Sequence, residues 1–278
     1  MMPELIGKIS RQFPVFRGKY SLFRFLLQQG IRTRKDVLVS TKSGTQFLLP
    51  NINEAIGFSI FINGVYEQDH IRFIVNNLPP NGCFIDAGAN IGAICIPVAK
   101  QRPDVQVIAI EASAKVFSYL QQNVQMNRCD NITLINKALS NTSDHLTEFY
   151  SPGELYGKGS MSAVFTKTSE MVETVRVDDL SEEYQTDHID LVKIDVEGYE
   201  RIVFEGMEKL FSAGRVSTIL MEFCAWTEDL AKGCKAGSAQ ELLKEKGFIF
   251  SLFDRAKLTP LPSILITGDA MLVAKYTK

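Results

Sequence analysis

Short apolar runs alternate with stretches of helical periodicity from residue 83 almost to the end of the sequence, and this alternation constrains the fold more than any other feature. Strands that alternate with helices form right-handed crossovers and a mostly parallel sheet with helices on both faces. The last two strands have no helix between them, so they are expected to pair antiparallel at the sheet edge, joined by a loop over residues 257–269. Strands are expected at residues 83–87, 105–110, 132–136, 145–151, 189–194, 216–222, 247–253 and 270–276, and helices at 67–78, 91–101, 113–127, 199–213 and 236–246.

The composition is that of an ordinary globular protein. The 278 residues are 45% hydrophobic and 22% charged, which suits one large α/β domain with an extra segment, or two small domains. No run approaches the ~20 apolar residues of a transmembrane helix, and the start, "MMPELIGKIS", lacks the apolar core of a signal peptide. Five cysteines without a C-x-x-C pair indicate a reducing, cytoplasmic compartment and no zinc site.

The N-terminal segment is strongly basic. Residues 1–35 contain eight Lys or Arg residues and one acid, Glu4, interleaved with apolar residues. We expect helical structure with breaks at Pro14 and Gly30. Such a segment packs on the main domain and leaves its charges in water, docks a partner, or makes a peripheral contact with an anionic membrane surface.

A predicted hairpin follows this segment, because residues 37–50 contain two short apolar runs around a Ser43-Gly44 turn. The expected domain organisation is therefore a basic helical and hairpin extension at residues 1–50, followed by the main domain at 51–278.

The sequence "CFIDAGANIG" (83–92) places a glycine loop directly after a buried strand, where open α/β sheets bind ligands. A dinucleotide loop would have its first glycine where this chain has Asp86, and a carboxylate there would repel a pyrophosphate. It suits the ammonium group of S-adenosylmethionine (SAM) instead. We expect Gly88 to let the backbone pass close under the ligand, and Asn90 to cap the next helix.

A second acid, Glu111, ends the next strand roughly two dozen residues after Asp86. An acid at that position accepts the ribose hydroxyls of a bound nucleoside. NAD enzymes also place an acid there, so the pair of acids favours SAM and leaves NAD as the alternative. Small Ala138 and apolar Leu139 follow the third strand and are expected to meet the adenine ring.

A third cluster, "DLVKIDVEGYE" (190–200), places Lys193, Asp195 and Glu197 at the exit of another buried strand. Alone, such a cluster is equally well explained as a solvated strand end with a helix-capping acid. After a SAM loop, however, this strand exit is where the methyl acceptor is expected.

These motifs together resemble the FkbM family of SAM-dependent methyltransferases, in the family's order and spacing over residues 55–275. The pairing of "KIDVEG" with a "DxGANIG" loop is the specific part of the resemblance. The matching stretches are "GVYE" (64–67), "FIDAGANIG" (84–92), "AIEAS" (109–113), "NKALS" (136–140), "VRVDDL" (175–180), "VKIDVEGYE" (192–200) and "LMEF" (220–223).

The resemblance implies a Rossmann-like methyltransferase fold with seven strands, the last one reversed, and O-methylation of a hydroxyl on a sugar, glycan or natural product. It implies that Asp195 lies near the methyl group or the acceptor, and that Tyr66 and Glu67 cover the pocket. The complete set expected to bind the cofactor is Tyr66, Glu67, Asp86, Gly88, Ala89, Asn90, Gly92, Glu111, Ala112, Ala138 and Leu139.

Methyl transfer is an in-line displacement that needs an oriented acceptor and a group to take its proton. Asp195 is the first candidate for this group, with Lys193 to tune it and Glu197 beside it. We expect no metal, although Asp195, Glu197 and Glu222 leave open a divalent cation.

The remaining candidates are weaker. His70 could face the pocket, whereas His145 and His188 are expected on the surface. Trp226 either lines the acceptor pocket or is a buried aromatic without function.

Three functions compete: a SAM-dependent O-methyltransferase, an NAD-dependent oxidoreductase, and a non-catalytic SAM-binding module. A nucleic-acid partner is not expected, because the main domain is acidic and a nucleic-acid methyltransferase needs a basic cleft. The acceptor depends on the expected loops at residues 51–66, 151–172 and 225–237, which carry no diagnostic pattern. The oligomeric state is equally open.

Overall fold

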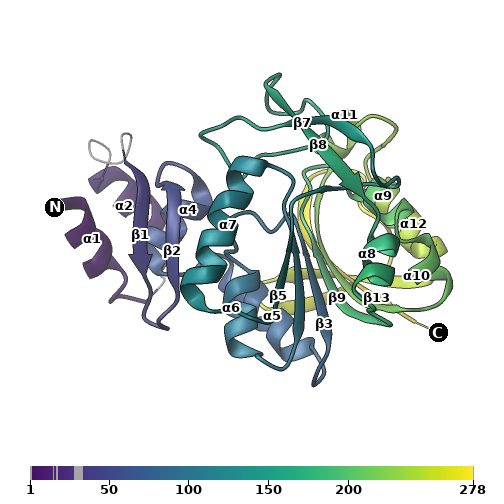
Figure 1. The fold of residues 1–278 in the computed structure, drawn as a ribbon, viewed down its shortest axis with the longest axis horizontal. Coiled ribbons are helices and arrows are strands. Elements are labelled where there is room, and N and C mark those ends of the chain that lie inside the picture. The colour runs from purple at the N-terminus through teal and green to yellow at the C-terminus, as the bar shows by residue number, and fades with distance from the viewer. Residues whose placement is uncertain (1, 15, 17, 28–33, 278) are drawn as a thin grey trace.

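A computed structural model describes residues 2–14, 16, 18–27 and 34–277 of the chain, with a sheet of eight strands at its centre (Figure 1). Parallel pairing joins the five strands at one side of the sheet, and antiparallel pairing joins the rest. In spatial order the strands are β5 (Ile132–Ile135), β4 (Gln106–Ile110), β3 (Cys83–Ala87), β9 (Ile189–Ile194), β10 (Val216–Cys224), β13 (Asp269–Tyr276), β11 (Phe248–Asp254) and β12 (Lys257–Leu261).

Helices cover both faces of this sheet, because neighbouring residues of each central strand point to opposite cores. On β3, Phe84 belongs to one core cluster and Ile85 to the other. The first face carries α5 (Gln68–Asn77), α6 (Cys95–Gln101) and α7 (Ala114–Asn127), and the second carries α8 (Val177–Glu183), α9 (Glu200–Glu205), α10 (Glu208–Ser212) and α12 (Ser238–Glu245) (Figure 1). The predicted doubly wound, mostly parallel sheet with a reversed last strand is confirmed.

The C-terminal edge differs from expectation in one respect, because the expected loop at residues 257–269 contains the eighth strand, β12. Arg255 and Ala256 form the turn before it, both with positive φ (46° and 62°), and Asp254 pairs with Lys257 across the turn. Two-residue hairpin turns of this kind favour Asn-Gly, so the Arg-Ala pair gave no warning of a hairpin.

A second, three-stranded sheet stands above the main one and contains the strand expected at residues 145–151 (Figure 1). Its strands are β6 (Ala138–Leu139), β8 (Ser169–Val175) and β7 (Leu146–Tyr150), with β8 in the middle. The small sheet therefore lies at the carboxyl end of the main sheet, next to the loop that follows β5.

The helix expected at residues 199–213 is instead two short helices, α9 and α10, separated at Gly206. A Cβ atom at Gly206 would lie 2.1 Å from the carbonyl oxygen of Ser140, so only glycine allows this close approach.

The N-terminal part packs as a layer beyond α7 (Figure 1). It consists of α1 (Met2–Ser10), α2 (Lys19–Leu26) and a hairpin of β1 (Lys35–Ser40) and β2 (Gln46–Asn51), followed by α4 (Ala55–Asn63). The hairpin and the break at Pro14 are confirmed, whereas Gly30 lies outside the described residues.

Two segments expected as loops are helical: α4 lies within residues 51–66, and α11 (Ala225–Leu230) lies within 225–237. Helix α4 was missed because six of its nine residues are buried on all sides of the helix, which removes the amphipathic periodicity that reveals a helix. Within the described residues, no helix combines the length and apolar character needed to cross a membrane.

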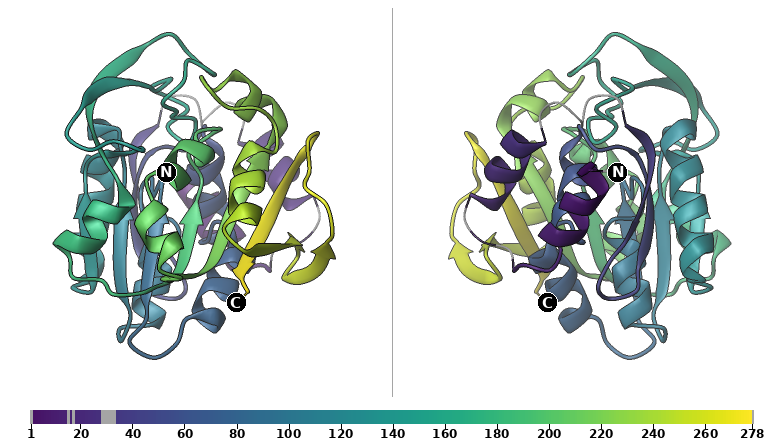
Figure 2. Two further views of the ribbon diagram at one scale, coloured as in Figure 1. Left: turned by 90° about the vertical axis from the view of Figure 1, so that its right-hand side faces the viewer. Right: turned by 90° about the vertical axis from the view of Figure 1, so that its left-hand side faces the viewer.

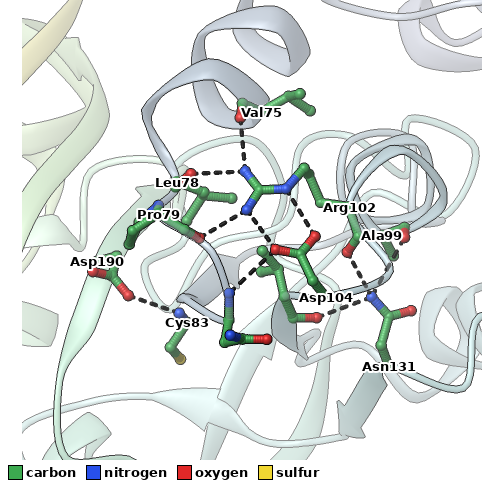
Figure 3. A network of polar contacts seen from close by, with 11 residues as sticks. Val75, Leu78, Pro79, Cys83, Ala99, Arg102, Asp104, Asn131 and Asp190 are labelled. Atoms are coloured by element: carbon green, nitrogen blue, oxygen red, sulfur yellow. Dashed lines mark hydrogen bonds and ion pairs between the residues drawn. The ribbon is translucent and has the colours of Figure 1, made fainter.

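At the opposite end of the parallel strands, Arg102 joins the end of α5 to the connection between α6 and β4 (Figure 3). Its guanidinium donates to the carbonyl oxygens of Val75 (3.1 Å), Leu78 (2.7 Å) and Pro79 (2.7 Å), and it pairs with Asp104 at 2.7 Å. These bonds satisfy carbonyls at the end of α5, and they hold that helix against the connection between α6 and β4.

Candidate functional site

The candidate site lies at the carboxyl ends of β3, β4, β9 and β10, where the expected residues converge. Asp86 on β3 is paired directly with Lys193 on the neighbouring strand β9. This placement follows from the parallel register, which brings the exits of neighbouring strands to the same edge of the sheet.

Asp86 is the most unusual residue of this site. Its side chain is 1% exposed, and neither carboxylate oxygen makes a hydrogen bond of good geometry among the described residues, although the N–H and thiol of Cys95 lie near enough to favour its charged form. Burial raises its pKa to about 6, even though Lys193 favours the charged form. A buried carboxylate without such a bond is costly unless a ligand satisfies it. The ammonium group of SAM fits this requirement, because it brings a positive charge and several hydrogen-bond donors.

In the glycine loop every second residue has positive φ: Gly88 (79°), Asn90 (52°) and Gly92 (85°). The N–H groups of Gly88 and Ala89 donate to the carbonyl of Ile110 on β4 at 3.0 and 2.9 Å. The loop is therefore fixed to the neighbouring strand.

The structure changes the expected reason for glycine at position 88. A Cβ atom there would lie 2.1 Å from the carbonyl oxygen of Asp195, so glycine allows the loops after β3 and β9 to touch. The expected helix cap by Asn90 is wrong, because α6 begins only at Cys95. The Asn90 side chain instead accepts from Ile91 N–H (2.9 Å) and donates to the Tyr156 carbonyl (2.8 Å).

Glu111 holds two backbone segments together. One carboxylate oxygen accepts from Asn90 N–H at 3.0 Å and the other from Ser113 N–H at 2.9 Å. Burial raises its pKa to about 7. Each oxygen retains a second lone pair, so the predicted bonds to ribose hydroxyls are compatible with these contacts.

Beside Glu111 lies a mostly apolar cavity that brings five of the predicted cofactor residues together: Gly88, Glu111, Ala112, Ala138 and Leu139. Sequence reasoning did not identify the other residues of the lining. They lie at the end of β4, on β7 and in connecting segments: Ile110, Phe149, Lys137, Met161 and Val196. Its mostly apolar lining is compatible with the faces of an adenine ring.

Next to the glycine loop, the buried Lys193 pairs with the partly buried Asp195, with 3.2 Å between Nζ and Oδ2. Burial opposes ionisation of Asp195, but the nearby Lys193 outweighs it and holds the pKa of Asp195 below its usual value. The same pairing raises the pKa of Lys193 despite its burial. The two groups therefore stabilise each other as ions.

Three carboxylates converge at this point: oxygen atoms of Asp195, Glu197 and Glu222 all lie within 4.8 Å of one another. The ionised Asp195, together with burial, raises the pKa of Glu222 to about 8. Lys158, which sequence reasoning missed, pairs with Glu197 at 2.7 Å. The trio has the hard oxygen ligands that a divalent cation prefers, so both the metal-free and the metal-bound alternatives have a structural basis.

Tyr66 and Glu67 lie at the same site, at the start of α5. Burial raises the pKa of Tyr66, and the charges of Glu67 and Asp195 raise it further. Glu67 has a left-handed backbone (φ 43°), and its carboxylate pairs with His70 at 2.8 Å. His70 thus contacts the site through Glu67.

Residues from the expected acceptor segments also meet here. Trp226 on α11 is 50% exposed, so it is not a buried aromatic, and its ring packs edge-on against Phe165 with 5.5 Å between centroids. The Lys158 ammonium lies over the Phe165 ring, 5.2 Å from the ring centroid. His145 and His188 are exposed, as expected.

Comparison with known proteins gives one family. Residues 86–250 match the methyltransferase FkbM domain. Methyltransferase sdnD of Sordaria araneosa is 27% identical over 237 residues, which cover 73% of this chain and 88% of that protein. Hexuronic acid methyltransferase AglP of Haloferax volcanii is 28% identical over 161 residues, 57% of this chain and 63% of that protein.

Among solved structures, a SAM-dependent O-methyltransferase of Thermotoga maritima is 15% identical, with a TM-score of 0.44, over 94% of this chain and 82% of that one. The family match covers more than half of the chain and includes the glycine loop and the carboxylate cluster. It decides the choice between SAM and NAD in favour of SAM. The chain belongs to the FkbM family of SAM-dependent methyltransferases.

Proposed function

We propose that this methyltransferase methylates a hydroxyl oxygen of an uncharged, polyhydroxylated acceptor such as a sugar, glycan or natural product, with Asp195 receiving the proton. The observation that carries this proposal is the partly buried carboxylate of Asp195, 27% exposed and held as an ion by the buried Lys193, directly beside Gly88 of the glycine loop. SAM, when bound, supplies an electrophilic methyl group. Asp86, Glu111 and the apolar cavity are the residues we expect to hold it.

The charge balance of the site favours a neutral acceptor. With Glu222 protonated, the negative charges of Asp195 and Glu197 are matched by Lys193 and Lys158. A carboxylate acceptor would add an unmatched negative charge beside these acids, which a buried site disfavours.

Asp195 can act as the base despite its low pKa. A hydroxyl proton becomes strongly acidic as its oxygen gains a third bond, so a weak base is sufficient. The carboxylate of Asp195 first accepts the hydroxyl hydrogen bond, which orients the oxygen, and then receives the proton. Lys193 holds the carboxylate in position through the 3.2 Å ion pair.

The relative from Haloferax volcanii is a hexuronic acid methyltransferase, which supports the sugar part of this proposal but not the uncharged part. A hexuronic acid offers both hydroxyls and a carboxylate. The product distinguishes them: a methyl ester is cleaved by mild alkali, whereas a methyl ether survives. We therefore expect labelled methyl transferred from SAM to sugars and lipid-linked sugars to be alkali-stable. An alkali-labile product would contradict hydroxyl methylation.

The variant Asp195→Asn tests the role of Asp195. Asparagine preserves shape but removes the base, so we expect turnover to fall by about 10²–10⁴-fold, while binding of S-adenosylhomocysteine by calorimetry stays within a few-fold. Asp187→Asn, whose side chain is 96% exposed just before the start of β9, at the opposite end of the parallel strands, is the matched control. Full activity in Asp195→Asn would remove Asp195 from the mechanism, and SAM binding with no turnover on any acceptor would favour a non-catalytic module.

The convergence of Asp195, Glu197 and Glu222 favours a divalent cation as the second candidate arrangement. Dialysis against a chelator distinguishes the metal-free mechanism from the metal-bound one. If the carboxylates act without metal, activity is unchanged after chelation. If activity is lost and restored by Mg²⁺, the metal-free mechanism is wrong while methyl transfer itself stands.

A further inference from the structure

Exposed apolar side chains concentrate on the N-terminal layer of the molecule. Of the large hydrophobic residues exposed in the described part of the chain, more than half lie within residues 5–38. They are Leu5, Ile9, Phe13, Phe16, Tyr20, Leu22, Phe25, Leu26 and Leu38. Scattered apolar residues on a surface need no explanation, but a dense group of this kind marks an interaction site.

On helix α2, three exposed apolar side chains share one face of the helix. Leu22, Phe25 and Leu26 have the i, i+3, i+4 spacing of one helix face, and all three are exposed. The opposite face already packs inward, through the buried Leu27 and the partly buried Phe23. The helix thus has two apolar faces, and only one of them is covered by the protein.

Helix α1 is arranged in the same way. Gly7 packs so closely on Phe61 of α4 that a Cβ atom would lie 2.6 Å from the ring, and the Ser10 hydroxyl donates to the Ile62 carbonyl at 2.8 Å. Leu5 and Ile9, four residues apart, remain exposed. Both helices pack on α4 and lie on the same outer face of the molecule (Figure 2, right).

The connection between the helices is held by a buried lysine. Lys19 is 1% exposed, and its ammonium donates to the carbonyl oxygens of Ser10 (2.9 Å) and Phe13 (3.1 Å). This contact fixes the end of α1 against the start of α2. The backbone of the exposed Phe13 is therefore fixed in place by its hydrogen bond with Lys19.

The charges around this face are basic. Lys8, Arg24 and Lys35 are exposed, whereas Arg11 and Lys19 are buried. A second copy of the chain would bring the same positive charges together, so self-association through this face is disfavoured electrostatically. An anionic lipid surface complements both the apolar side chains and the basic ones.

We propose that the outer face of α1 and α2 binds peripherally to an anionic membrane surface, with Leu22, Phe25 and Leu26 entering the headgroup region. Apolar insertion and basic attraction act together here, as stable peripheral binding requires. Because α4 lies directly beneath and leads through Gly64 to Tyr66 and Glu67, this binding would hold the catalytic site close to the lipid surface.

Sedimentation of the full chain with vesicles tests the proposal. We expect binding to vesicles of phosphatidylcholine with phosphatidylglycerol, weaker binding in high salt, and little binding to phosphatidylcholine alone. The double variant Leu22→Ser, Phe25→Ser should weaken the partition coefficient by about tenfold or more. The matched control is Leu146→Ser, Ile249→Ser, which removes two exposed apolar side chains elsewhere and should leave binding unchanged.

Several results would overturn the proposal: no sedimentation with anionic vesicles, equal binding to neutral vesicles, or equal loss in the control variant. Light scattering gives a further test. If the protein is a dimer and the Leu22→Ser, Phe25→Ser change dissociates it, this face binds a second copy of the chain and the proposal is wrong. None of these measurements depends on methyl transfer, so they test the membrane face independently of the proposed acceptor.

Discussion

Asp86 and Gly88 stand two residues apart in the glycine loop, yet the structure explains them differently. Asp86 is a buried acid without a hydrogen bond of good geometry among the described residues, which is the property expected of a residue that awaits a cationic ligand. Gly88 is required by the protein itself, because its backbone touches Asp195. One residue is thus explained by the ligand and the other by packing.

Asp86→Asn should weaken binding of S-adenosylhomocysteine by about tenfold or more, because the ammonium loses its charged partner. Folding should not suffer, since asparagine removes the cost of a buried charge. Calorimetry measures the affinity and thermal unfolding the stability. The matched control is Asp190→Asn on β9, where the side chain accepts from Cys83 N–H at 2.8 Å and asparagine can still accept. Unchanged affinity in Asp86→Asn would contradict the assigned role.

At the scale of the elements, the two ends of the parallel strands have different tasks. The carboxyl ends carry the site, whereas the opposite end is joined by Arg102 (Figure 3). Its bonds cap the last carbonyls of α5, the helix whose first turn carries Glu67. Arg102 therefore stabilises the helix from the end far from the chemistry.

Arg102→Ala should lower the free energy of unfolding by about 1–3 kcal/mol, because the carbonyls of Val75 and Leu78 lose their donor. Affinity for S-adenosylhomocysteine should stay unchanged, since the site is at the other end of the sheet. Urea denaturation gives the first quantity and calorimetry the second. Arg255→Ala is the matched control, because that side chain is 90% exposed. Equal stability of the two variants would show that the network contributes nothing.

For the whole molecule, buried acids make stability depend on pH. Burial, and for Glu222 the charge of Asp195, raises several acid pKa values: to about 6 for Asp86, about 7 for Glu111 and Glu228, and about 8 for Glu200 and Glu222. Between the ordinary pKa and these values, the folded protein holds protons that the unfolded chain releases. The free energy of unfolding therefore falls as pH rises from about 5 to about 8.

Each acid protonated only in the folded state contributes a slope of about 1.4 kcal/mol per pH unit. Urea denaturation at pH 5, 6.5 and 8 measures the total slope. Glu200→Gln should flatten it, while its side-chain oxygen can still accept from Val196 and Gly198 N–H. The exposed Glu183→Gln is the control and should not change the slope. Stability that rises with pH over this range would contradict the argument.

The sequence by itself determined the doubly wound sheet, the strand exits and the acids Asp86, Glu111 and Asp195. These features are local, because apolar runs, glycine loops and the residues after them lie within a few positions of one another. The buried helix α4 and the hairpin to β12 escaped prediction for the same reason, since neither has its usual local pattern.

Only the tertiary structure decided what surrounds those acids. Phe149 of β7 and Met161 of the segment between β7 and β8 line the apolar cavity, Lys158 pairs with Glu197, and the charge of Asp195 raises the pKa of Glu222. Each of these contacts joins residues far apart in the chain, and each depends on burial, which no single segment possesses alone. The glycine loop could thus be recognised from its own residues, whereas the charges on which the proposed neutral acceptor rests come together only when the chain is folded.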